Sequence, residues 1–123
     1  MRVRIEHRTA FDYQTPASAS FSEVRLTPRN DEKQNLLEFQ LVTEPAAKAV
    51  SYRDHFGTLV HVFDVWPPHL RLAVTGRSTV VTYPRRAPGA DVGDLALLDD
   101  PVLRDTHAEW LHPSPLASGG DHL

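Results

Sequence analysis

The sequence predicts a mainly β protein, an antiparallel β-sandwich or open barrel with one short C-terminal helix. Three observations lead to this prediction. Apolar and polar residues alternate with a period of two in several segments between residues 3 and 83. Turn sequences rich in proline, glycine and aspartate separate these segments at short intervals, as in all-β domains. A helix start signal occurs late, near residue 100.

The first two strands are expected before residue 28. Odd positions in residues 3–13 are mostly apolar or aromatic and even positions are mostly charged, so we expect a half-buried strand that Gln14-Thr15-Pro16 ends. A second strand should run from about Ala19 to Thr27, with Val24 facing inward. Phe21 is out of phase with this pattern, which predicts a β-bulge.

Two further strands flank the middle of the chain. The third is expected at Asn35–Glu44, with Leu37 on the apolar side of the alternation. Trp66-Pro67-Pro68 should break the chain, because prolines remove ladder donors and fix φ. The last strand is expected at Leu70–Tyr83, and Gly76 within it predicts a bend or bulge.

A β-hairpin is predicted between the third and last strands, at Tyr52–Phe63. Its turn is Asp54-His55-Phe56-Gly57, in which Asp54 can accept hydrogen bonds from the backbone beyond it and Gly57 tolerates positive φ. His61 has the parity of Phe63, so we expect a buried and hydrogen-bonded histidine.

After the strands the composition changes. Pro84–Gly93 is predicted to be a loop, and Asp99-Asp100-Pro101 to start a helix, because an acidic cap precedes a proline whose missing donor costs nothing there. The helical stripe reaches Leu111. We therefore expect one β-rich domain at residues 1–112 and a linker or frayed tail at residues 113–123.

Composition excludes several function classes. Of 123 residues, 41% are hydrophobic and 24% charged, as expected for a globular domain. Lys and Arg number 13 and Asp and Glu 16, so no basic excess supports nucleic-acid binding. There is no cysteine, which removes disulfides, thiolate metal ligands and a cysteine nucleophile. Neither a signal peptide nor a membrane-spanning run is present, so we expect a cytoplasmic protein with no membrane contact.

Histidines are the candidate catalytic or metal-binding residues, but their spacing is unfavourable. Ser51, Asp54 and His55 could form a Ser-His-Asp set on paper, yet Ser51 lacks the Gly-x-Ser-x-Gly elbow that exposes a nucleophile. His55, His61 and His69 could bind zinc, yet their spacing fits no compact ligand motif. We therefore expect no catalytic residue, no cofactor and no metal.

The order of several short motifs resembles a known family. Ile5–Tyr13, Glu23–Arg29, Asp54–Gly57, Trp110-Leu111 and Pro113–Leu116 are similar to the N-terminal region of bacterial transglutaminase-like proteins. The resemblance implies that a papain-like Cys-His-Asp core follows this region and carries the catalytic residues. It also implies a set of structural motif residues, namely Asp54, Phe56, Gly57, Arg25 and Pro28.

The resemblance therefore implies a non-catalytic accessory domain that docks on or positions a transglutaminase-like, cysteine-protease-like core in cis. Two alternatives stay open. One is a separate peptide- or protein-binding module that uses a sheet edge or the Trp66-Pro67-Pro68 segment. The other is a histidine metal-binding domain. A homodimer is also compatible with the exposed apolar surface that an excised domain would carry.

Overall fold

Six β-strands make up most of the first 84 residues in the computed structural model, which describes residues 1–84 and 94–115. The strands are β1 (Arg2–Ala17), β2 (Ser20–Val24), β3 (Gln34–Glu44), β4 (Val50–Arg53), β5 (Leu59–Val65) and β6 (His69–Thr82). The chain divides into two compact units, Met1–Arg85 and Arg86–Leu123, and these strands belong to the first.

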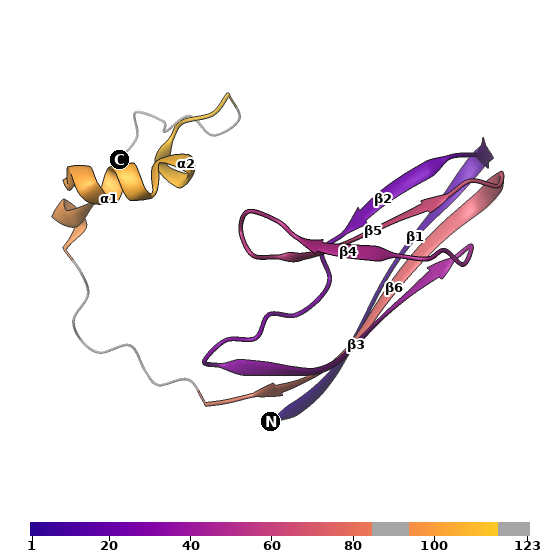
Figure 1. Cartoon of the computed structure of the whole chain (residues 1–123), viewed down its shortest axis with the longest axis horizontal. Coiled ribbons are helices and arrows are strands. Elements are labelled where there is room, and N and C mark those ends of the chain that lie inside the picture. The colour runs from indigo at the N-terminus through magenta and orange to yellow at the C-terminus, as the bar shows by residue number, and fades with distance from the viewer. Residues whose placement is uncertain (85–93, 116–123) are drawn as a thin grey trace. The chain divides into compact units, whose positions relative to one another are not determined.

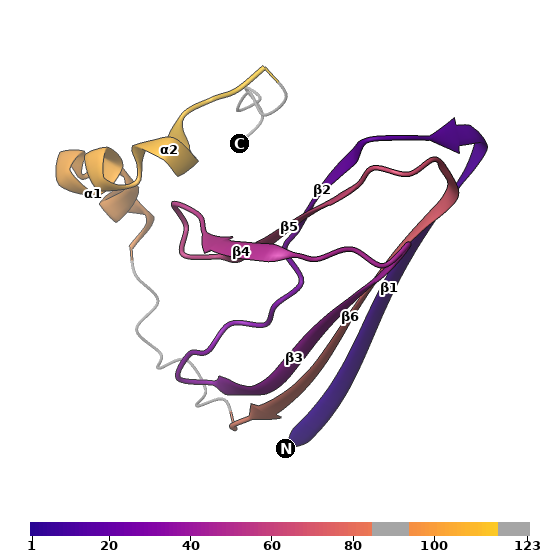
Figure 2. The ribbon, with the colours of Figure 1, turned by 45° about the vertical axis from the view of Figure 1, so that its right-hand side comes forward.

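The strands form two three-stranded antiparallel sheets, which confirms the predicted β-sandwich. One sheet has the order β1-β6-β3 and the other β2-β5-β4. Figures 1 and 2 show them as two layers rather than a closed barrel. Because β6 and β5 are the central strands, β1, β3, β2 and β4 each have one edge without a strand partner among the described residues.

The hydrophobic core lies between the facing sides of the two sheets. Val24 of β2, Phe63 and Val65 of β5, and Leu72 and Val74 of β6 form one buried cluster. Half-buried residues pack against this cluster from β1, β3 and the loops that connect the strands: Tyr13, Leu26, Leu41, Ala47 and Ala49. The alternation of apolar residues seen in the sequence thus produces a single shared interior.

β1 is longer and more exposed than predicted. It continues through Pro16 to Ala17, with a register shift between Asp12 and Ala17. Proline is tolerated there because an edge strand needs hydrogen bonds on one side only. Ile5 and Phe11, which should have been half-buried, are 44% and 51% exposed. The strand lies at a sheet edge, so half of its predicted apolar face lacks a neighbour.

β2 is shorter and more regular than predicted. It ends at Val24 instead of Thr27, and its pairing with β5 is continuous, so the expected bulge at Phe21 does not form. Phe21 simply faces outward and is 71% exposed. Its ring meets that of Trp66 edge to face at a centroid distance of 5.8 Å.

Two predictions about β3 and β6 were also wrong. A register shift between Leu36 and Glu38 turns Leu37 outward, so Leu36 instead pairs with the buried Val80. Gly76 forms no bulge, since its pairing with both neighbouring strands is continuous. A Cβ at Gly76 would lie 3.1 Å from Leu26 Cδ1, so the glycine makes room for the Leu26 side chain.

The second unit contains short helices instead of the predicted single one. A 3-10 helix (Leu95–Asp99) precedes α1 (Pro101–Thr106) and α2 (Ala108–Leu111). The predicted start is confirmed: the Asp100 carboxylate accepts from Val102 N–H, and Pro101 follows it. The Thr106 hydroxyl donates to the Val102 carbonyl at 2.8 Å, a contact that bends helices, and α1 ends there.

Residues 85–93 of the predicted loop and residues 116–123 of the predicted tail lie outside the described residues. The predicted domain boundary at residue 112 stays a prediction. Among the helices that the structure describes, none has the length and apolar character needed to cross a bilayer. The predicted cytoplasmic location likewise stays a prediction.

Candidate functional site

The hairpin turn between β4 and β5 is built around the side chain of Asp54. One carboxylate oxygen, Oδ1, accepts from the backbone N–H of Phe56 at 3.0 Å and of Thr58 at 2.9 Å. Gly57 N–H donates to the Asp54 carbonyl at 2.9 Å, and Gly57 has a φ of 73°. The turn has the hydrogen bonds expected from aspartate at its start and the backbone conformation that favours glycine at its end.

A polar cluster joins this turn to β2. Arg25 donates from Nε to Asp54 Oδ2 at 3.5 Å and from Nη2 to Glu23 Oε2 at 3.1 Å. The Tyr52 hydroxyl donates to Glu23 Oε1 at 3.2 Å. We call Glu23, Arg25, Tyr52 and Asp54 the turn cluster. It links residues about 30 positions apart in sequence on the outer face of the β2-β5-β4 sheet.

Two arginines tie the backbone of the turn to its surroundings. Arg29 Nη2 donates to the Phe56 carbonyl at 2.8 Å, and Arg53 Nη1 donates to the Gly57 carbonyl at 2.9 Å. Pro28 is half-buried just before Arg29. Of the predicted motif residues, the structure thus brings Arg25 to Asp54 directly, whereas Pro28 adjoins the arginine that holds Phe56.

The sequence did not single out Glu23, Tyr52 or Arg29 as site residues. The strand register contains a signal for Tyr52 and Arg25. Tyr52 of β4 pairs with Val60 of β5, and Val24 of β2 pairs with His61 of β5. Arg25 follows Val24 and therefore lies on the same face as Tyr52. That signal requires the pairing partners, which period-two alternation alone does not supply.

Desolvation, hydrogen bonds and charges within the cluster shift the pKa values of its residues. Desolvation raises the pKa of the Asp54 carboxyl, but the hydrogen bonds from Thr58, Arg25 and Phe56 together lower this pKa below its ordinary value. Desolvation, followed by the charge of Glu23 and its hydrogen bond, raises the pKa of Tyr52. The hydrogen bond to Glu23 is the largest contribution to the raised pKa of Arg25. The cluster therefore favours an ionised Asp54 and a neutral Tyr52.

Because the folded-state pKa of Asp54 is lowered, its ionisation should stabilise the fold in a pH-dependent way. The contribution is present above the unfolded-state pKa, about 3.9, and disappears as the pH falls through the lower folded-state pKa. Asp54→Asn should lower the melting temperature at pH 7, and this difference from wild type should shrink as the pH falls below about 4. Thermal melts from pH 7 to pH 2 test this, and a pH-independent difference would contradict it.

The turn cluster borders exposed apolar side chains on the same outer face. Val60 beneath the cluster is fully buried, whereas Tyr52 and Val50 on β4 are 44% and 68% exposed. Phe21 and Trp66 lie on the same outer face, in contact with each other, and are 71% and 63% exposed. We call Phe21, Val50, Tyr52 and Trp66 the apolar outer patch. Aromatic side chains beside ordered polar groups are typical of protein interfaces.

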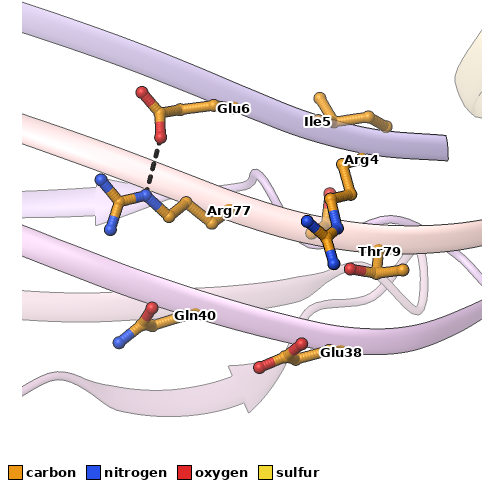
Figure 3. A pocket seen from close by; sticks show the side chains of 8 residues that line it. Arg4, Ile5, Glu6, Glu38, Gln40, Arg77 and Thr79 are labelled. Carbon is orange, nitrogen blue, oxygen red and sulfur yellow. Dashed lines mark hydrogen bonds and ion pairs between the residues drawn. The ribbon is translucent and has the colours of Figure 1, made fainter.

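The outer face of the other sheet has a different character. A shallow hollow of about 330 Å³ lies there, and its lining includes Arg4, Glu6, Glu38, Gln40 and Arg77. Figure 3 shows Glu6 of β1 bonded to Arg77 of β6, at 2.7 Å. Ion pairs Arg8–Glu44 at 3.5 Å and Arg71–Asp12 at 3.6 Å extend this pattern along the sheet. These exposed pairs indicate a solvated, charge-balanced surface.

The structure gives Asp54 and Ser51 of the candidate Ser-His-Asp set separate surroundings. The Asp54 carboxylate is bonded by Phe56, Thr58 and Arg25, and Ser51 pairs in register with His61 on the inner side of β4. Within the described parts of the chain, no group of three or more His, Cys, Asp or Glu residues could hold a metal ion.

Among the described residues, His69 is buried and His61 is half-buried, and their environments differ. His69 is 7% exposed, with Nδ1 2.8 Å from the Pro67 carbonyl and Nε2 3.1 Å from the Ser20 hydroxyl. His61 lies inward, as predicted, with its ring 5.2 Å from that of Phe39. Its Nδ1 is buried without a hydrogen-bond partner, so the expected hydrogen bond is not made at that atom.

The fold and the site together define a class of protein: a two-sheet antiparallel β-sandwich domain with an ordered polar cluster at one hairpin turn. Residues 3–81 match the family described as the bacterial transglutaminase-like N-terminal region. The chain belongs to this family, as the sequence motifs implied.

Relatives of the chain are longer proteins. An uncharacterized protein of Mycobacterium leprae is 38% identical over 112 residues, which cover 85% of this chain and 40% of the relative. An uncharacterized protein of Mycobacterium tuberculosis is 34% identical over 84 residues, which cover 68% of this chain and 27% of the relative. The chain thus spans less than half the length of either relative.

The fold also occurs in a solved structure. A candidate cysteine protease from Cytophaga hutchinsonii has a TM-score of 0.52 and 17% sequence identity, with 67% of this chain and 27% of that chain covered. At this identity the similarity concerns the fold alone.

Proposed function

We propose that this chain is a non-catalytic accessory domain that docks on a transglutaminase-like catalytic core through the apolar outer patch and the adjoining turn cluster. The observation that carries the proposal is the contrast between the two outer faces of the sandwich. One face is covered by ion-paired side chains, whereas the other exposes Phe21, Val50, Tyr52 and Trp66. Exposed apolar patches with a polar rim mark interaction surfaces.

The proposed occupant is the core domain, because the family is an N-terminal region and the relatives extend well beyond the matched part. The chain has no cysteine, so in this proposal the papain-like nucleophile lies in the core. The accessory domain itself would carry out no amide hydrolysis or transfer.

The turn cluster would give the docking surface a fixed shape. Tyr52 and Arg25 are held by Glu23, and Arg25 is also bonded to Asp54. Tyrosine and arginine are enriched among the residues that dominate binding energy at interfaces. Holding them in place before binding reduces the side-chain entropy that association costs.

A binding measurement with matched variants tests this proposal. The transglutaminase-like core of a longer relative, expressed separately, should bind the 123-residue chain in calorimetry. Val50→Arg places a charge in the apolar outer patch and should weaken binding at least about tenfold. Gln40→Arg places the same charge on the opposite outer face and should leave binding unchanged. Equal effects of the two substitutions, or no binding by the wild-type chain, would refute the proposal.

A further inference from the structure

The free edge of β1 has a regular set of backbone groups. Met1 and Thr82 exchange both hydrogen bonds, N to O at 2.6 Å and 2.7 Å. The register with β6 is continuous from Arg2 to Asp12, so odd-numbered residues of this stretch bond to β6. The N–H and C=O groups of Arg2, Arg4, Glu6, Arg8, Ala10 and Asp12 therefore point away from the sheet. No strand pairs with them in residues 1–84 or 94–115.

Apolar side chains on the inner side of this edge are also incompletely covered. Ile5 and Phe11 share the face of the buried Val74 and Val80, yet they are 44% and 51% exposed. Phe11 also lines a hollow of about 330 Å³ between β1 and β2, which reaches core residues such as Val24. In the described residues, the outward backbone groups of β1 thus have no strand partner, and its inner side chains Ile5 and Phe11 are incompletely covered.

We infer that a second copy of this chain covers the edge, with two β1 strands pairing antiparallel around a two-fold axis at His7. A two-fold axis normal to the sheet pairs residues that lie on the same face. Each residue before His7 pairs with the residue of the other copy that lies the same number of positions after His7. Arg2 then faces Asp12 of the other copy, Glu6 faces Arg8, and Arg4 faces Ala10. By symmetry each opposite-charge pair occurs twice, His7 faces its own copy, and no Lys, Arg, Asp or Glu faces a like charge.

The inner side is complementary in the same register. Phe11 faces Val3 of the other copy, and Ile5 faces Thr9, so the exposed apolar side chains gain neighbours. The outward N–H and C=O groups of the even-numbered residues would form the ladder, which makes one six-stranded sheet from two three-stranded ones. A long unprotected edge strand is otherwise prone to uncontrolled association.

Neighbouring registers are less favourable. Centring the pair on Glu6 or Arg8 places that residue opposite its own copy, and centring it on Ile5 places Arg2 opposite Arg8. A centre at Thr9 places Glu6 opposite Asp12. A centre at Ala10 makes one repeated charge pair instead of two and extends the ladder into the irregular stretch before Ala17. Charge complementarity therefore selects His7.

This interface is separate from the proposed docking surface, which lies on the other sheet. Sedimentation equilibrium of the 123-residue chain should show a monomer–dimer equilibrium. Arg2→Asp and Asp12→Arg should each weaken dimerisation about tenfold, because each creates two like-charge cross-strand pairs. An equimolar mixture of the two variants should recover wild-type affinity, since the heterodimer has only opposite charges at these positions.

Thermal melts establish that each variant is folded, and Glu38→Arg on β3, at the opposite edge of the sheet from β1, is a control that should leave dimerisation unchanged. A wild-type chain that stays monomeric across the concentration series would overturn the inference. Single variants that dimerise as well as wild type would exclude this edge. Weakened variants that do not recover on mixing would exclude the register centred on His7.

Discussion

Phe63→Ala is expected to lower the free energy of unfolding by about 3–5 kcal/mol, because it removes an aromatic ring from a core that cannot close around the space. Phe63 is 2% exposed and belongs to the buried cluster shared by β2, β5 and β6. Since domains are stable by only about 5–15 kcal/mol, a large part of the stability would be lost. Urea unfolding followed by circular dichroism measures the change.

Phe21→Ala is the matched control, since Phe21 lies on the neighbouring strand β2 and is 71% exposed. The exposed Phe21 ring contacts Trp66 edge to face, so its loss should cost less than about 1 kcal/mol. If both substitutions lowered the free energy of unfolding by similar amounts, the buried position of Phe63 in the structure would be contradicted.

His69→Ala is expected to cost about 2–4 kcal/mol, the second-largest effect. The ring is nearly buried, bonds to the Pro67 carbonyl and the Ser20 hydroxyl, and meets Tyr13 edge to face at 5.8 Å. Its removal leaves a cavity and takes hydrogen-bond partners from Ser20 and Pro67. Denaturant unfolding at pH 7 measures the cost.

A double-mutant cycle with Ser20→Ala isolates the hydrogen bond between the two side chains. The coupling should be about 1 kcal/mol, with the double variant less destabilised than the sum of the single ones. Gln40→Ala, on the exposed outer face of β3, should change stability by less than about 0.5 kcal/mol. A cost for His69→Ala no larger than that for Gln40→Ala would argue against the structural role of His69.

Most strands were predictable, because alternation with a period of two follows directly from side chains pointing to opposite faces of a strand. The turn at Asp54–Gly57 and the helix start at Asp100 were predictable for a similar reason. Their hydrogen bonds connect residues two to four positions apart, so the residues that form them are neighbours in the sequence.

Errors arose where a residue's environment depended on a distant strand. Leu37 fits the alternation of β3, but a register shift against β6 turns it outward. Gly76 resembles a bulge residue, but it provides space for Leu26 from the connection between β2 and β3. Ile5 and Phe11 have the pattern of a buried face, but the strand order places β1 at an edge.

The sequence by itself determined the β class, the approximate strand positions, the signature turn and the family, because each depends on local pattern or on the order of short motifs. The tertiary structure alone decided that Arg25 and Glu23 meet Tyr52 and Asp54, and which outer face stays apolar. It also decided that the edge of β1 is free. These properties depend on which strands pair and in what register, and pairing is set by long-range packing that alternation cannot specify.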